Sequence, residues 1–181
     1  GDVYKRQLYN RALEGFEEML GAKHSFTLRT VGNLAGLFEK QNKLDEAELL
    51  YKRALKGQEE MLGRKHSDTL KTVNNLALLL KKQNKLDEAE LLYKRALEGQ
   101  EEMLGRKHSD TLTTVNNLAL LLKKQNKFDE AELLYKRALE GEEEMLGSKH
   151  SDTLITVNNL AFLFEEQNKL DEAELLSLIH I

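Results

Sequence analysis

At 181 residues the chain is long enough for one domain of ordinary size, and its apolar content of 40% can supply a core. It contains no proline, and its many Ala, Leu, Glu, Lys and Gln residues favour helices over strands. A net charge of −4 disfavours a nucleic-acid binder, the absence of cysteine excludes disulfides and thiolate metal sites, and no apolar run approaches membrane-spanning length.

Both ends of the chain depart from the pattern of the rest. One DNA sequence encodes Gly1–Gln7 on one strand and Leu176–Ile181 on the other. This DNA sequence resembles a transposase-type sequencing adaptor, so we expect residues 1–7 and 177–181 to be adaptor scars. The remaining residues 8–176 are then an internal fragment, of the kind that metagenomic read assembly produces, with neither natural end.

Between these ends a cassette of 42 residues repeats. Tyr9, Tyr51, Tyr93 and Tyr135 stand 42 residues apart, and one residue separates each of them from the sequence Arg-Ala-Leu. Periods of about 20 to 50 residues are typical of units that bury their apolar faces by stacking on one another. The period predicts a partial second helix at 8–20, complete helix pairs at 26–62, 68–104 and 110–146, and a truncated repeat at 152–176.

The cassette at 67–108 shows how the first helix of each pair is specified. Apolar residues recur at three- and four-residue spacing from Leu70, which indicates one buried helical face. One of the polar residues at 67–69, Ser-Asp-Thr, is expected to cap the first amides. Asn84 is expected to end this helix in a left-handed turn.

The second helix of the cassette begins with acidic residues and ends at a glycine. Asp87 and Glu88 suit the positive end of the helix dipole, and Gly105 stops the helix. Methionine serves here as an ordinary core filler. The predicted buried stripe is Ala89, Leu92, Tyr93, Ala96, Leu97, Met103 and Leu104, with Met19, Met61 and Met145 at the equivalent of Met103.

This pattern resembles the tetratricopeptide repeat, and the likeness covers Leu8 to Leu176. The motifs Leu-Gly-x-x-His before the first helix and Asn-Asn-Leu-Ala within it are similar to the kinesin light chain type. The resemblance implies an all-α, right-handed superhelical solenoid of antiparallel helix pairs. The residues that carry it are Leu76-Ala77, Leu80, Asn84, Leu86, Ala89, Tyr93 and Ala96-Leu97.

One departure from that family recurs in every copy. Serine stands where the family has proline after the histidine, and we expect the serine to cap the helix instead. The serines are Ser25, Ser67, Ser109 and Ser151.

The resemblance also implies that the first helices line a concave groove that holds peptides. Asparagine amides offer a donor and an acceptor to a peptide backbone, and lysines attract carboxylates, so an acidic peptide is the expected ligand. The lysines can equally be solvated and paired with Asp87 or Glu88, so both interpretations stay open. The candidate groove residues are Arg29, Asn33, Lys71, Asn74, Asn75, Leu78, Lys81, Lys82, Asn116, Asn117, Leu120, Lys123, Lys124, Asn158, Asn159 and Phe162.

Nothing in the sequence indicates catalysis or a cofactor. The histidines at 24, 66, 108 and 150 fall one to a repeat without a second ligand at helical spacing, so a link or capping role is expected instead of a metal site. The carboxylates of Glu142, Glu143 and Glu144 point in different directions along a helix. Neither a phosphate-binding glycine loop nor a nucleophile with a neighbouring base is present, so we expect no enzyme activity.

The sequence therefore predicts a protein–protein interaction module that binds an extended peptide, as kinesin light chain-like cargo adaptors do. Two alternatives remain open: the sensor arm of a nucleotide-switching signalling protein, and a structural scaffold of stacked repeats. We expect a cytoplasmic location, no nucleic-acid or membrane partner, and fraying or weak self-association at the truncated end.

Overall fold

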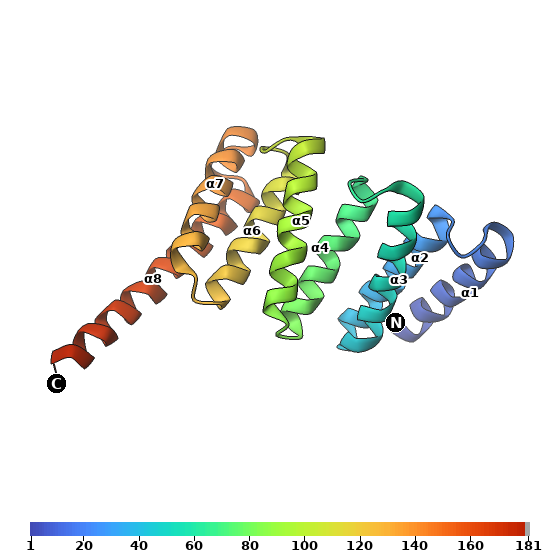
Figure 1. Cartoon of the computed structure of the whole chain (residues 1–181), viewed down its shortest axis with the longest axis horizontal. Helices are drawn as coiled ribbons and strands as arrows, with labels where there is room; N and C mark the ends of the chain where they lie inside the picture. The colour runs from blue at the N-terminus through green and yellow to red at the C-terminus, as the bar shows by residue number, and fades with distance from the viewer. Residues whose placement is uncertain (180–181) are drawn as a thin grey trace. The chain divides into compact units, whose positions relative to one another are not determined.

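The computed structural model describes residues 1–179, with side chains through Asn168. Within this range the chain forms eight α-helices and no strand (Figure 1), which confirms the predicted all-helical class. None of the described helices is both long and apolar enough to cross a membrane. The helices are α1 (Asp2–Leu20), α2 (Ser25–Lys40), α3 (Leu44–Leu62), α4 (Ser67–Lys82), α5 (Leu86–Leu104), α6 (Ser109–Lys124), α7 (Phe128–Leu146) and α8 (Ser151–Ile179).

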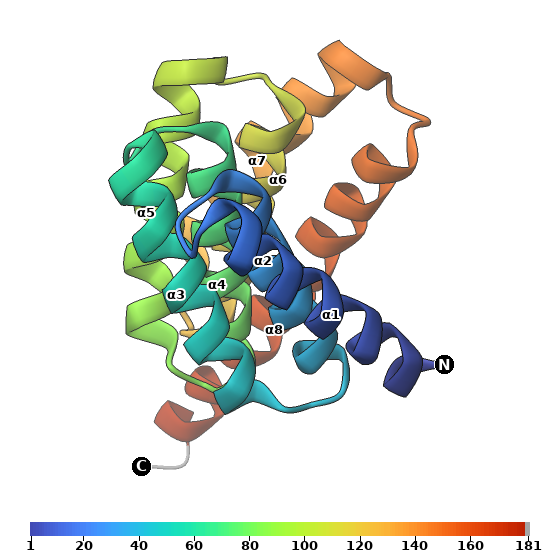
Figure 2. The ribbon, with the colours of Figure 1, turned by 90° about the vertical axis from the view of Figure 1, so that its right-hand side faces the viewer.

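The helices belong to two compact units, Gly1–Met103 and Leu104–Ile181. In the first unit α1 packs against α2, α2 against α3 and α3 against α4; in the second, α6 packs against α7 and α7 against α8. Short loops join these neighbours, so consecutive helices within a unit run in opposite directions (Figure 2). Each unit is thus a stack of antiparallel helices.

Small residues let the paired helices approach closely. Ala47 and Ala54 on α3 are fully buried, as are the corresponding Ala131 and Ala138 on α7. Close approach increases the number of dispersion contacts that the larger side chains between the helices can make. The predicted alanine and tyrosine stripe is therefore the core of each pair.

The turns within the pairs depend on a left-handed asparagine. Asn42, Asn84 and Asn126 have φ values of 59°, 62° and 60°, a region that asparagine tolerates better than other side chains do. The predicted role of Asn84 is confirmed. The second helices end at glycines with φ near 90°, among them Gly63 at 93°.

Histidine, and not a residue at 67–69, caps the first helix of a pair. His66 Nδ1 accepts a hydrogen bond from the amide of Asp68 at 3.2 Å, and Ser67 is already the first helical residue. Thr69 instead donates to the carbonyl of Gly63 at 2.9 Å, which ties the loop to the preceding helix. The predicted caps at residues 67–69 and at the serines are therefore wrong, and the capping role of the histidines is confirmed; His24, His108 and His150 act in the same way.

The methionines do not lie on the buried stripe. Met103 is 61% exposed and Leu104 is 38% exposed, and Met19, Met61 and Met145 are exposed as well. α5 has 19 residues whereas α4 has 16, so the last turn of the second helix projects beyond its partner. The predicted buried stripe of the second helix thus extends one turn too far towards the C-terminus.

The first and last helices differ from the repeating pattern. α1 begins at Asp2, so residues 2–7 continue the helix, and their origin as an adaptor scar stays a prediction. α8 is one helix of 29 residues, without the turn that ends α2, α4 and α6.

Ion pairs join successive helix pairs in the first unit. The buried Glu48 accepts hydrogen bonds from Lys52 Nζ at 2.5 Å and from Lys85 Nζ, in the next pair, at 2.7 Å. Burial acts to raise the pKa of Glu48, but hydrogen bonds from Lys52, Lys85 and Gln83 outweigh it and lower the pKa to about 2. Glu48 therefore stays ionised at pH values at which an ordinary glutamate takes up its proton.

Candidate binding site

A pocket of about 370 Å³ lies between α2, α3 and α4 in the first unit. Arg29 and Asn33 reach it from α2, and Lys71 and Asn75 reach it from α4. The two residues on each helix are four positions apart and therefore share one helical face. The structure thus brings four of the predicted groove residues together at one site.

The pocket carries a surplus of positive charge. Arg29 and Lys71 form no ion pair with any described residue, although Arg29 lies 4.9 Å from the centre of the Phe26 ring. Asp68 also lines the pocket and offsets one of the two positive charges. The site can therefore attract a carboxylate without breaking an existing salt bridge.

The inner wall of the pocket consists of Gly32, Gln58 and Thr72. Gln58 and Thr72 are 6% and 7% exposed. Gln58 Oε1 has no hydrogen-bond partner among the described groups. A side chain at Gly32 would meet no atom within 4 Å at its Cβ, so the glycine leaves open space in the pocket that the unpaired Gln58 Oε1 also lines.

In the second unit the corresponding three residues form a closed network, here called the carboxamide bridge: Asn116, Glu142 and Thr156. Asn116 Nδ2 lies 2.8 Å from Glu142 Oε1 and 2.7 Å from Thr156 Oγ1. The bridge joins α6, α7 and α8. Asn116 was predicted to contact a ligand, but its amide N–H groups are already used within the protein.

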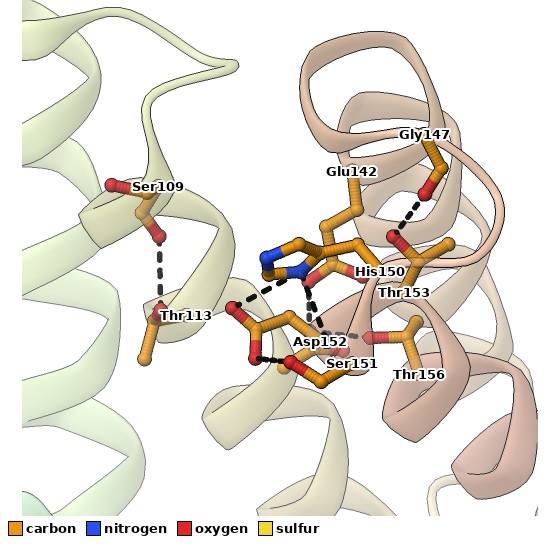
Figure 3. A network of polar contacts seen from close by, with 10 residues as sticks. Ser109, Thr113, Glu142, Gly147, His150, Ser151, Asp152, Thr153 and Thr156 are labelled. Carbon is orange, nitrogen blue, oxygen red and sulfur yellow. Dashed lines mark hydrogen bonds and ion pairs between the residues drawn. The ribbon is translucent and has the colours of Figure 1, made fainter.

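Figure 3 shows Glu142, a buried carboxyl group of this network, together with Thr156. Burial raises its pKa, and the hydrogen bonds from Thr156 and Asn116 only partly oppose that effect. His150 and Asp152 at the start of α8 act in opposite directions on the pKa of Glu142, because the charge of Asp152 raises it and that of His150 lowers it. The second unit therefore holds a carboxyl group that gives up its proton less readily than an exposed glutamate.

Two of the predicted groove lysines are engaged in ion pairs. Lys82 Nζ lies 2.6 Å from Glu39 Oε1, and Lys123 Nζ lies 2.9 Å from Glu166 Oε1. The partner of Lys82 is thus in the preceding repeat and not, as one sequence interpretation held, at Asp87 or Glu88. Asn74, Lys81 and Lys124 also make polar interactions.

The other predicted groove residues lie outside the pocket. Leu120 is 38% exposed on α6 and Phe162 is 49% exposed on α8, with Lys123 Nζ 5.9 Å from the centre of the Phe162 ring. These side chains offer an apolar surface in the second unit. Leu78, Asn117 and Asn159 are half-buried, and Asn158 is exposed.

Sequence reasoning missed the inner wall of the pocket. Gly32, Gln58 and Thr72 are not among the candidate groove residues named from the sequence. A signal was nonetheless present, because Gly32 stands where the later copies have Asn74, Asn116 and Asn158.

The family model described as tetratricopeptide repeat matches residues 6–60, 50–102, 68–144 and 110–177. A search of curated proteins gave no match.

Several solved structures share the fold. The crystal structure of BtubC (BKLC) from P. vanneervenii is 26% identical, covers 96% of this chain and 70% of its own, and superposes with a TM-score of 0.85. Nearly identical TPR-like repeats from a putative kinesin light chain of Podosopora anserina are 21% identical, cover 99% and 85%, and give a TM-score of 0.82. The predicted resemblance to repeats of the kinesin light chain type is therefore confirmed.

A more distant structure is the N-terminal domain of stress-induced protein-1 from C. elegans. It is 16% identical, covers 74% of this chain and 94% of its own, and has a TM-score of 0.55. This similarity is one of fold alone.

Proposed function

The chain belongs to the tetratricopeptide repeat family, and from this premise we propose that its first unit binds an extended acidic segment of a partner protein in the pocket between α2, α3 and α4. Repeats of this family serve in protein–protein interaction or as scaffolds. Binding, and not catalysis, is accordingly the activity that we assign to the chain.

The observation that carries this proposal is the pair of cations in the pocket. Arg29 and Lys71 face the same space from two helices and have no carboxylate partner among the described side chains. Asn33 and Asn75 stand beside them with groups that can both donate and accept hydrogen bonds. A peptide rich in aspartate and glutamate would find charge complementarity and backbone partners at one site.

The kinesin light chain-like neighbours agree with a cargo-adaptor role, which we propose for the full protein. A cytoplasmic location stays a prediction, as do the two alternatives of a signalling sensor arm and a scaffold.

The test is fluorescence anisotropy with a short labelled peptide rich in aspartate and glutamate. We expect Arg29→Ala combined with Lys71→Ala to raise the Kd at least about tenfold, because two charge-assisted contacts are lost. Lys94→Ala combined with Lys136→Ala is the matched control, since it removes the same charge from exposed positions outside the pocket. Equal weakening by both double variants would mean that only overall charge matters.

A further inference from the structure

The repeat of α2 and α3 lacks a side chain that the repeat of α6 and α7 has. In the carboxamide bridge, the amide of Asn116 connects the second helix of its pair to the first helix of the next. The same cassette positions in the first unit hold Gly32, Gln58 and Thr72. Gln58 and Thr72 thus stand where Glu142 and Thr156 stand in the carboxamide bridge, but the asparagine that would donate to both of them is missing.

The unfilled position opens into the pocket. Gln58 is 6% exposed and has an unpaired Oε1, and it stands at the cassette position of Glu142, whose Oε1 receives the Asn116 amide. A buried acceptor without a donor is costly, so a ligand that supplies one gains more affinity here than at an exposed amide. Thr72 supplies a hydroxyl at the place that Thr156 occupies in the bridge.

The size of the pocket suits a whole side chain. Water occupies about 30 Å³ per molecule in the liquid, so 370 Å³ is ample for an asparagine or glutamine side chain with its flanking backbone. Arg29 and Lys71 lie at the same pocket, where acidic neighbours of that side chain would reach them.

We propose that this pocket recognises an asparagine or glutamine side chain of the partner segment, whose amide donates hydrogen bonds to Gln58 and Thr72 as the Asn116 amide does in the carboxamide bridge. This inference rests on the proposed function and adds the identity of the recognised residue. The partner is thus an acidic segment with a central carboxamide.

The experiment compares two labelled peptides on the full chain. Both are rich in aspartate and glutamate; one has a central asparagine and the other a central leucine of similar size. We expect the asparagine peptide to bind about tenfold more tightly, because leucine would leave Gln58 buried and unpaired.

Two variants and one control test whether the preference for the asparagine peptide arises in this pocket. Gly32→Asn places the missing carboxamide within the protein, so the two peptides should then bind within about twofold of each other. Gly15→Asn is the matched control, since Gly15 also has no atom within 4 Å of a Cβ but lies on α1 outside the pocket; it should keep the preference. Gln58→Leu should abolish the preference independently of Gly32.

The outcomes separate this inference from the proposed function. If wild-type protein binds both peptides equally well, the carboxamide inference is wrong and acidic-peptide binding stands. If neither peptide binds, both proposals fail. A preference that survives in Gly32→Asn or in Gln58→Leu would also overturn the inference.

Discussion

At the residue scale, the two units differ at one buried position. Gln58 and Gln100 occupy it in the first two repeats, whereas Glu142 occupies it in the third. A neutral amide and a carboxyl group have nearly the same shape, but only the carboxyl group can ionise. Glu142 Oε2 has no hydrogen-bond partner among the described groups, so its charge is poorly compensated.

This arrangement predicts a pH dependence of stability. Because burial raises the pKa of Glu142 above 4.5, the folded protein binds its proton more tightly than the unfolded chain does. The contribution of protonated Glu142 to the free energy of unfolding is therefore fully present below pH 4.5. It is lost as the pH rises through the pKa that Glu142 has in the folded protein. Glu142→Gln should therefore raise the free energy of unfolding at pH 7 by about 1 kcal/mol, as measured by urea denaturation.

The reverse substitution provides the control for that measurement. Gln100→Glu places a carboxyl group at the equivalent position of the preceding repeat and should lower stability more at pH 7 than at pH 4. If Glu142→Gln left the loss of stability between pH 4 and pH 7 unchanged, Glu142 would not be its source.

At the element scale, glycine sets the distance between the two helices of a pair. A Cβ on Gly57 of α3 would lie 2.5 Å from Leu28 Cδ2 of α2, and a Cβ on Gly141 of α7 would lie 2.8 Å from Leu112 Cδ2 of α6. Both leucines are 2% exposed, so they have little room to move aside. Gly15 of α1 has the same cassette position but no atom within 4 Å.

The same substitution should therefore have opposite effects at two of these positions. Gly57→Ala should lower the free energy of unfolding by about 1 kcal/mol, because crowding of Leu28 outweighs the better helix propensity of alanine. Gly15→Ala should raise it by about 0.5 to 1 kcal/mol, because only the propensity changes. Denaturant unfolding of both variants checks this, and stabilisation by Gly57→Ala would contradict the close approach.

Features that depend on local sequence were predicted well. The helical period, the left-handed Asn84 and the terminal Gly105 each follow from the conformational preferences of a few neighbouring residues. The exposed Met103 and the unbroken α8 were missed, because burial depends on how far a neighbouring helix extends and on which side chains would meet if the chain turned back. Period alone does not contain that information.

Part of the candidate site could be expected from the sequence. The family resemblance implied that Arg29, Asn33, Lys71 and Asn75 lie on the groove face, and the structure brings them to one pocket, while their contact with a ligand stays a prediction. The buried Gln58 comes from a different helix, and no pattern within the first helices points to it. The network that engages Asn116 also depends on contacts between helices.

At the scale of the whole molecule, two helices present complementary faces. α8 exposes residues whose counterparts on α6 are buried: Leu154 is 52% exposed where Leu112 is 2% exposed, and Val157 is 42% exposed where Val115 is fully buried. In the complete pairs the second helix covers this face, and a glycine of that helix packs against the leucine, as Gly141 of α7 does against Leu112 of α6. α1 has the sequence of such a second helix, and its Gly15 faces no leucine.

We therefore predict that the chain associates head to tail, with α1 of one molecule covering α8 of another and Leu154 packing against Gly15. Such a contact uses two different surfaces and does not close on itself, so the average mass should keep rising with concentration in sedimentation velocity. Leu154→Glu should keep the protein monomeric, because it would bury an unpaired charge in the contact. Leu133→Glu is the matched control, since Leu133 is 70% exposed on α7, away from this face. A constant monomer mass for the wild type would contradict the prediction, and equal dissociation by both variants would place the contact elsewhere.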